Sequence, residues 1–242
     1  LLFLLAYAAA KENPHALEMV TVTLTQMRKG GIFDQIGYGF SRYSTDPYFL
    51  APHFEKMLYD NALLTLAYAA AYAVTGVSGF LYTAEKTAAY VLRELTGPEG
   101  AFYAAEDADS DGEEGKFYLF GYDELLGILG REEGEAFARY YGITKKGNFE
   151  GSNIPNRLHA ENEGGAFDAY LPRLVQYRRQ RARLHLDDKI LTSWNALMIA
   201  AFAFLQRITG KSCYLDAARK ARGFIEAKLA DGDKLFVSYR DG

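Results

Sequence analysis

Residues 61–76 read N-A-L-L-T-L-A-Y-A-A-A-Y-A-V-T-G, and parts of this stretch occur elsewhere in the chain. The hexapeptide L-A-Y-A-A-A spans residues 66–71 and also residues 5–10. The opening Asn-Ala-Leu returns at residues 195–197, and the closing Thr-Gly returns at the same offset at residues 209–210. Matches at a fixed offset are typical of a repeated structural unit. The chain is therefore predicted to contain at least three copies of one unit.

Each copy is predicted to be a helical hairpin that ends in a strand-like piece. An Ala-rich apolar helix, such as residues 58–74, is followed by a short turn and a second, amphipathic helix. The second helices are predicted at residues 16–29, 81–95 and 214–229. Weaker helices are predicted at residues 122–129, 133–141 and 167–184, around an unusually long polar loop at residues 144–165.

Helices that are apolar on nearly all sides must be buried, whereas helices with one charged face can cover them from outside. Hairpins arranged in this way can close into a ring. The predicted fold is therefore all-α: an (α/α) toroid with short β-hairpins at one mouth. Residues 1–242 are predicted to be a single domain that forms part of a larger ring. The alternative is an open helical solenoid, but solenoid repeats of about 20–45 residues are shorter than these units.

Composition narrows the class of protein. The chain has 242 residues, of which 49% are hydrophobic and 24% charged, as in a globular protein with a substantial core. A net charge of −4 offers no basic surface for phosphates, so no nucleic-acid partner is expected. Residues 1–10 are apolar but too few to span a bilayer, so no membrane partner is expected. The single cysteine, Cys213, favours a reducing, cytoplasmic location, and no cofactor or metal is predicted.

The segment 51–61, A-P-H-F-E-K-M-L-Y-D-N, is predicted to open one apolar helix, with its proline in the first turn. Polar side chains here would be costly to bury, which favours a cavity. We predict His53 and Glu55 as catalytic groups, and Asp60 and Asn61 as substrate-binding groups. Glu55 could instead stabilise the helix start. Asn61 could instead bond within a turn that Asn195 repeats.

The segment 34–43, D-Q-I-G-Y-G-F-S-R-Y, combines glycines, aromatic rings, an acid and a base. This mixture is found in sugar-binding clefts. We predict Asp34 as a catalytic acid, and Tyr38, Arg42 and Tyr43 as substrate-binding residues. The alternatives are strand packing for Tyr38 and an ion pair of Arg42 with Asp34 or Asp46.

An acidic run spans residues 106–114. It begins like a calcium-binding EF-hand loop, at Asp107, Asp109 and Asp111, but Tyr118 stands where that loop needs a glutamate. A hairpin turn with solvated acids is the alternative. We predict that Glu106 and Asp107 reach the cavity as a catalytic pair, because glycoside cleavage generally needs two carboxyl groups.

A third polar motif, D-D-K-I-L-T-S-W-N at residues 187–195, precedes another apolar helix. We predict Asp188 as a catalytic acid, and Lys189, Trp194 and Asn195 as substrate-binding residues. The indole could be a platform for a sugar ring or could pack in the core. An ion pair between Asp188 and Lys189 is the alternative for those charges.

Three segments, residues 30–61, 104–120 and 187–195, resemble the spermatogenesis-associated thioredoxin-fused family, also called the YyaL-like proteins. The resemblance covers nearly the whole chain. It implies a toroid similar to six-hairpin glycosidases and N-acylglucosamine 2-epimerases, with a thioredoxin-like domain as a further part of the full-length protein. No thioredoxin C-x-x-C motif is present, so no redox role is carried onto these residues.

Two functions are compatible with this pattern. The first is a carbohydrate-active enzyme, either a glycoside hydrolase with paired acids or a sugar epimerase with His53 as the base. The second is a non-catalytic module of a thioredoxin-fused protein, which either binds a small-molecule or carbohydrate ligand or has a redox-linked regulatory role. In that case the thioredoxin-like domain would supply any redox function. Acids held by Arg42 or Lys189 would favour a structural network over hydrolysis.

Overall fold

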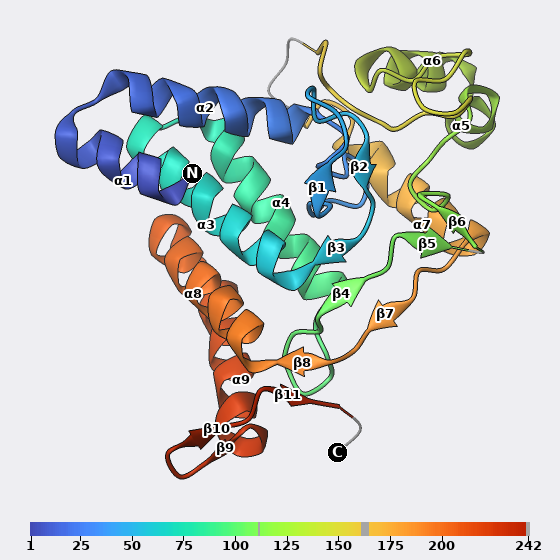
Figure 1. The fold of residues 1–242 in the computed structure, drawn as a ribbon. Coiled ribbons are helices and arrows are strands. Elements are labelled where there is room, and N and C mark those ends of the chain that lie inside the picture. Colours follow the sequence, from blue (N-terminus) through green and yellow to red (C-terminus); the bar gives the residue numbers. More distant parts are fainter. Residues whose placement is uncertain (111, 161–164, 241–242) are drawn as a thin grey trace. The chain divides into compact units, whose positions relative to one another are not determined.

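The computed structural model describes residues 1–110, 112–160 and 165–240 (Figure 1). The chain folds into two compact units. The first unit consists of residues 1–24, 56–106 and 186–242, and the second of residues 25–55 and 107–185. The assignment of the chain to one domain stays a prediction, and Asp111 of the acidic run lies outside the described residues.

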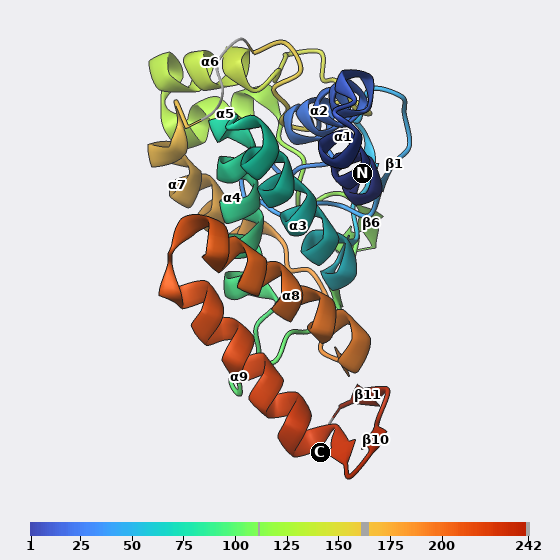
Figure 2. The same ribbon diagram turned by 90° about the vertical axis from the view of Figure 1, so that its left-hand side faces the viewer.

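The first unit is built from helical hairpins. Helices α1 (Leu2–Lys11), α3 (Leu58–Thr75) and α8 (Thr192–Thr209) form a row, in which α3 contacts both others. Helix α4 (Ser78–Glu94) packs on α3, and α9 (Ser212–Lys228) packs on α8 (Figure 2). Helix α2 (Pro14–Lys29) runs from the first unit into the second. The predicted hairpins are confirmed, with bounds that differ by a few residues.

The sequence repeat has a structural cause at both ends of α3 and α8. The side chain of Asn61 donates to the Met57 carbonyl at 2.9 Å, and Asn195 donates to the Leu191 carbonyl at 3.0 Å. Each helix ends at a glycine in the left-handed region, with φ of 71° and 72°. The preceding threonine hydroxyl donates four residues back in both helices. The repeat therefore encodes the way in which these helices start and stop.

The predicted burial of the apolar helices is correct for α3 but only in part for α1 and α8. Ala67, Tyr68 and Ala69 of α3 are fully buried, whereas Phe3 of α1 is 76% exposed. Ala200 of α8 is also exposed. The reason is position in the row, because among the described residues α1 and α8 each have an α-helical neighbour of the row on one side only.

Short strands connect the helices of the first unit. Strands β3 (Lys56–Met57), β4 (Ala105–Glu106) and β7 (Leu186–Asp187) form an antiparallel sheet in which Lys56 pairs with Glu106. Strand β8 (Ile190–Leu191) pairs with β11 (Ser238–Tyr239), and β9 (Ala230–Asp231) pairs with β10 (Lys234–Leu235). Two-residue strands of this kind bring the helix starts and the intervening loops together.

The predicted helix start at Pro52 is wrong. Pro52 and His53 form strand β2, which pairs with β1 (Tyr43–Ser44) in the second unit, and helix α3 begins only at Leu58. The backbone amide of Arg42 also donates to the Glu55 carbonyl at 2.8 Å. Pairing with the preceding segment therefore satisfies the backbone groups that a helix would otherwise have used.

The second unit contains helices α5 (Tyr122–Leu129), α6 (Arg131–Tyr140) and α7 (Leu171–Arg181), a single 3₁₀ turn (Asp168–Tyr170), and a hairpin of β5 (Asp109–Ser110) and β6 (Glu113–Glu114). Phe120, Phe137 and Leu174 are fully buried in its core. Within the predicted long loop, the side chain of Asn148 donates to the Ile154 carbonyl and that of Asn153 donates to the Thr144 carbonyl. No helix among the described residues is long and apolar enough to cross a membrane.

Candidate functional site

His53 lies between two carboxylates in the second unit. Its Nδ1 is 2.7 Å from Glu114 Oε1, and its Nε2 is 3.7 Å from Glu55 Oε2. Arg42 donates to Glu55 Oε2 at 3.1 Å, and the Tyr43 ring stacks on the imidazole with centroids 5.1 Å apart. These five residues, Arg42, Tyr43, His53, Glu55 and Glu114, are called the His53 cluster below.

Local pairing explains how the His53 cluster forms. Tyr43 and His53 are direct partners in the β1–β2 ladder, which places their rings side by side. Glu114 arrives on strand β6, from the acidic run, and its Oε1 also accepts from the Phe54 amide at 3.4 Å. The next residue, Gly115, has φ of 76° and lies against the Phe54 ring, where a side chain would not fit. The hairpin is therefore fixed close to His53.

Four predicted site residues meet in this cluster: Arg42, Tyr43, His53 and Glu55. Glu114 was missed by the sequence analysis. It lies within the acidic run, but nothing in that run indicates that its end folds back onto residue 53. Arg42 bonds to Glu55, a partner that was not among those named from the sequence.

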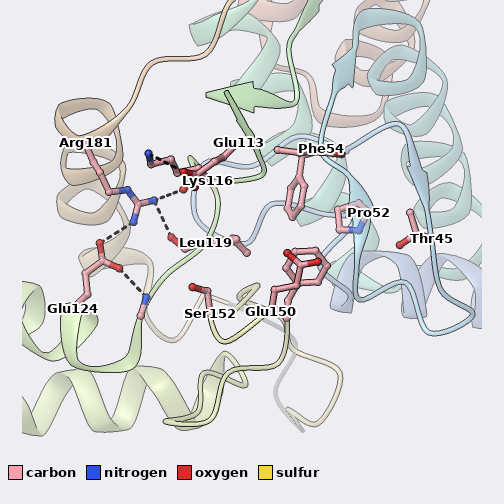
Figure 3. Close-up of a pocket in the computed structure, with 13 residues that line it drawn as sticks. Thr45, Pro52, Phe54, Glu113, Lys116, Leu119, Glu124, Glu150, Ser152 and Arg181 are labelled. Atoms are coloured by element: carbon pink, nitrogen blue, oxygen red, sulfur yellow. Dashed lines mark hydrogen bonds and ion pairs between the residues drawn. The ribbon is translucent and has the colours of Figure 1, made fainter. Parts of the chain in front are cut away.

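A cavity of about 610 Å³ adjoins the His53 cluster, because Glu114 and both neighbours of His53 line it (Figure 3). Phe54 and Glu150 lie between Arg181 at one end and Pro52 and Thr45 at the other. The cavity is lined by Thr45, Pro52, Phe54, Glu113, Glu114, Lys116, Leu119, Gly121, Glu124, Phe149, Glu150, Ser152 and Arg181. Its volume falls in the range of about 300–1,000 Å³ that is usual for ligand sites.

Arg181 holds one end of the cavity in place. Its guanidinium donates to the carbonyls of Lys116, Phe117 and Leu119 and to the carboxylate of Glu124, at 2.8 to 3.0 Å. Glu124 also accepts a hydrogen bond from the Tyr177 phenol, which, together with partial burial, raises the pKa of that phenol. This network fixes the segment between the β5–β6 hairpin and α5.

Asp34, predicted as a catalytic acid, has a structural partner in the second unit. Its two carboxylate oxygens each lie 2.9 Å from Nη1 of Arg178, and both side chains are almost fully buried. Asp34 also accepts from the amides of Ile36 and Gly37 at 3.0 Å. A carboxylate with these partners stabilises the charge of a buried arginine.

Tyr38 and Asp107 also belong to the second unit. Tyr38 has φ of 66°, and its ring packs on Phe33 with centroids 6.2 Å apart. Asp107 is exposed and accepts from the Asp109 amide at 3.3 Å, which fits a solvated turn. The contact of Asp107 is that of the solvated turn that the sequence left open, whereas Tyr38 packs on a neighbouring ring without belonging to a strand.

Glu106 lies in a separate polar group of the first unit. Its Oε2 accepts from the Tyr90 hydroxyl at 2.6 Å, and Lys56 Nζ lies 4.5 Å from the centre of the Tyr90 ring. Lys56 and Tyr90 are fully buried and were not predicted as site residues. Asp60 lies in the first turn of α3, where a negative charge favours the helix start.

The third motif also lies in the first unit. Asp188 pairs with Arg240 at 2.9 Å, and Lys189 pairs with Asp187 at 3.1 Å, so the expected pair of Asp188 with Lys189 is replaced by two others. Asp188 lines a cavity of about 150 Å³. Trp194 meets Tyr59 edge to face at 4.7 Å between centroids.

Asn61 and Asn195 are fully buried. Both hold a helix start, and Asn195 also accepts from the Phe102 amide at 2.8 Å and donates to the Phe102 carbonyl at 2.9 Å. The turn-bonding alternative for Asn61 therefore has direct support.

The predicted site residues are divided between the two units, and their gathering at one mouth stays a prediction. Within the described residues no group of three or more His, Cys, Asp or Glu side chains is arranged to hold a metal ion. In the His53 cluster the reason is geometric, because Glu55 and Glu114 face different ring nitrogens.

The chain is a distant homologue of spermatogenesis-associated protein 20. It is 33% identical to the mouse protein and 32% identical to the human protein, over 94% of its own length. It is also 30% identical to an uncharacterised protein of Caenorhabditis elegans. The chain spans about a third of the length of these relatives. No family model matches it.

Solved structures share the fold. An inactive variant of an α-1,6-mannanase of glycoside hydrolase family 76 from Salegentibacter, in complex with α-1,6-mannotriose, aligns with 95% of this chain and 45% of its own, at a TM-score of 0.53 and 15% identity. A family 76 glycoside hydrolase from Bacteroides thetaiotaomicron aligns with 94% of this chain and 33% of its own, at a TM-score of 0.56 and 10% identity. The chain thus has part of the six-hairpin (α/α) toroid fold. A cellobiose 2-epimerase from Bacillus thermoamylovorans aligns at a TM-score of only 0.38, which is too low to support a structural likeness.

Proposed function

We propose that this chain is the part of a carbohydrate-active enzyme in which His53 transfers protons to and from a sugar bound in the cavity of Figure 3. The fold is shared with carbohydrate-active enzymes, but a fold does not fix an activity. The observation that carries the proposal is the hydrogen bond between His53 and Glu114 beside a ligand-sized cavity. An imidazole oriented by a carboxylate is a common general acid–base device.

The partner at Nδ1 determines which ring nitrogen can react. An ionised carboxylate only accepts hydrogen bonds, so Glu114 requires a proton on Nδ1 of His53. In the neutral ring the lone pair is then on Nε2. Nε2 lies 3.7 Å from Glu55, which is too long for a hydrogen bond, and in this proposal it is the nitrogen that meets a sugar hydroxyl or a C–H bond.

The two carboxylates have different tasks in this proposal. Glu114 orients His53 and balances the charge of the ring once it has taken a proton. Glu55 faces Nε2 and is held by Arg42, so it can accept a hydrogen bond from a sugar hydroxyl that lies next to the reacting atom. The C–H bond next to the carbonyl of the open-chain sugar breaks, its proton moves to Nε2 and its electron pair passes into an enediolate. In the second half of the reaction the proton returns from Nε2 to that carbon and the carbonyl forms again.

Proton transfer at carbon, as in an epimerase, is favoured over glycoside hydrolysis. Two carboxylates lie on either side of the ring, and glycoside hydrolysis generally needs two carboxyl groups. However, Glu114 is bonded to His53 and Glu55 to Arg42, which leaves no carboxylate of the cluster without an ionic partner. Acids held by Arg42 are expected to favour a structural network over hydrolysis, so proton transfer is assigned to His53 and not to a pair of acids.

The proposal is tested by incubating the purified protein with reducing and non-reducing mannose and glucose oligosaccharides in D₂O. Deuterium incorporation at a sugar carbon, followed by NMR, reports proton transfer, and new reducing ends report hydrolysis. We expect deuterium incorporation that falls about 10²- to 10⁴-fold in His53→Ala. His15→Ala, at an exposed histidine on α2, is the matched control and should keep full activity.

Three other outcomes have distinct meanings. Hydrolysis that depends on His53 would replace the epimerase-like reaction by a hydrolytic one at the same site. Sugar binding without conversion would support the non-catalytic binding module. Conversion that is unchanged in His53→Ala, or a panel in which no sugar binds, would overturn the proposal.

A further inference from the structure

We infer that the cavity beside the His53 cluster selects sugars that carry a positively charged amino group, and that Glu150 is the residue that recognises this group. The inference rests on the proposed function and specifies the substrate class of the same site. It starts from the charges on the cavity wall. Four carboxylates and two cations line the cavity: Glu113, Glu114, Glu124, Glu150, Lys116 and Arg181.

Most of these charges are already satisfied within the protein. Glu124 pairs with Arg181 at 2.8 Å, and Glu113 lies 3.8 Å from Lys116. Each cation on the wall is therefore matched by one carboxylate. Arg181 is further occupied by three backbone carbonyls, so it is not available to an anionic ligand.

The remaining two carboxylates differ in their surroundings. Glu114 bonds to His53 and to the Phe54 amide. Glu150 forms no ion pair with any side chain that the structure describes. It is solvent-exposed, and its side chain lies on the wall of the cavity together with Phe149 and Ser152 (Figure 3). The charged group of the cavity wall that is left without an ion pair is thus the carboxylate of Glu150.

The backbone holds Glu150 in this position. Its φ of 48° lies in the left-handed region, which a residue with a side chain adopts only at a conformational cost. The turn is closed by hydrogen bonds in both directions between Phe149 and Ser152, at 2.8 and 3.0 Å. Glu150 is therefore presented by a fixed turn and not by a loose loop.

A carboxylate without an ionic partner favours a ligand that carries a positive charge. A sugar ammonium group at Glu150 gains an ion pair and a charge-assisted hydrogen bond. A uronic acid or a sugar phosphate brings a further negative charge to a wall with four carboxylates and two cations, so its binding is disfavoured. Neutral sugars fall between the two.

Calorimetric titration of the purified protein at low ionic strength tests this order. The probes are a glucosamine trisaccharide with charged amines, its N-acetylated neutral counterpart, and a galacturonate trisaccharide. We expect the glucosamine trisaccharide to bind most tightly and the galacturonate trisaccharide most weakly. Added salt should lower the affinity for the glucosamine trisaccharide much more than the affinity for the N-acetylated trisaccharide, because exposed charge pairs are screened.

The variant Glu150→Gln assigns the effect to one residue. Its side chain is exposed, so folding should be unaffected. We expect the affinity for the glucosamine trisaccharide to fall about fivefold, the upper end for an exposed ion pair, while that for the N-acetylated trisaccharide stays unchanged. Glu132→Gln, at an exposed glutamate on α6, is the matched control and should change neither affinity.

Two results would overturn the inference while the proposed function stands. One is galacturonate binding as tight as glucosamine binding. The other is an unchanged preference in Glu150→Gln when conversion still depends on His53. If none of the three trisaccharides binds and no sugar is converted, both the inference and the proposed function fail.

Discussion

At the scale of single residues, Glu114 determines what His53 can do. The distance of 2.7 Å between them identifies a direct hydrogen bond, and the carboxylate fixes the tautomer of the ring. A neutral amide at this position can present either its oxygen or its NH₂ group to the ring, so neither the tautomer nor the balancing charge is retained.

We therefore expect Glu114→Gln to lower kcat about tenfold or more for the sugar that the protein converts, with KM changed by less than about twofold. Steady-state kinetics measures both constants. Glu132→Gln, at an exposed glutamate on α6 outside the cavity, is the control. A rise in KM at constant kcat would assign Glu114 to sugar binding and contradict its role in orienting His53.

Asp34 has a structural role, unlike the carboxylates beside His53. It is bonded to Arg178, whose side chain is 1% exposed, so removing the carboxylate leaves a buried arginine without its counter-charge. Asp34→Ala is expected to lower the free energy of unfolding by about 3 to 5 kcal/mol, as measured by urea denaturation.

Glu135→Ala is the control for that experiment, because Glu135 pairs with the exposed Arg131 at the surface of α6. It should cost less than about 0.5 kcal/mol. If Asp34→Ala unfolds at the same urea concentration as the parent protein, the Asp34–Arg178 pair does not have the structural role assigned to it.

Which residues form the site was only partly predictable. His53, Glu55 and Arg42 could be proposed because they stand in one motif, within reach of local pairing. Glu114 could not, because its contact with His53 depends on the path of a distant hairpin. Asp34 could not be separated from catalytic acids, because its buried partner, Arg178, lies in a helix with no sequence relation to it.

At the scale of elements, the buried asparagine at the start of α8 joins a helix to a neighbouring strand-like segment. Asn195 bonds to both backbone groups of Phe102 and to the Leu191 carbonyl. Without this side chain, the buried amide and carbonyl of Phe102 lose a partner each.

Asn195→Ala is therefore expected to destabilise the protein by about 2 to 4 kcal/mol in urea denaturation, since each unsatisfied buried group costs about 1 to 3 kcal/mol. Thr21→Ala, which removes an exposed hydrogen bond on α2, should cost less than about 0.5 kcal/mol. An equal, small effect of both substitutions would contradict the assigned role of Asn195.

The helices were predictable from the sequence because apolar periodicity and glycine ends are local signals. The repeat gave the hairpins of α3–α4 and α8–α9, and residues 122–129 match α5 at both ends. The start of α3 was placed too early because Pro52 suits both a first helical turn and an edge strand. The pairing of β2 with β1 makes Pro52 part of a strand, and this pairing cannot be read from the residues next to Pro52.

At the scale of the whole molecule, neither compact unit is one continuous segment. In the second unit, residues 25–55 and 107–185 are joined by buried polar contacts. Arg157 donates to Gln35 at 2.8 Å, and Arg178 binds Asp34. Both arginines are buried, and a fragment of residues 107–185 would have to bury them without these partners.

We expect the isolated fragment 107–185 to lack a cooperative unfolding transition and to show poorly dispersed amide resonances. Adding a peptide of residues 25–55 should increase the dispersion. A fragment that folds cooperatively alone would show that residues 25–55 are dispensable for the second unit.

The fold class was predictable because alternating buried and amphipathic helices leave few ways to pack. The activity was not, since fold and function are separate properties and the chain spans about a third of its curated relatives. The toroid likeness explains why a sugar is the first ligand to test, and the His53 cluster indicates where to test it.

The role of His53 as the acid–base group is tested most directly by the rate of deuterium incorporation into a sugar. This rate is measured for the parent protein and for His53→Ala, with sugar affinity measured in parallel by calorimetry. If His53 is the acid–base group, the variant binds the sugar within about twofold of the parent protein while its rate falls about 10²-fold or more. An unchanged rate in His53→Ala at unchanged affinity would contradict the claim.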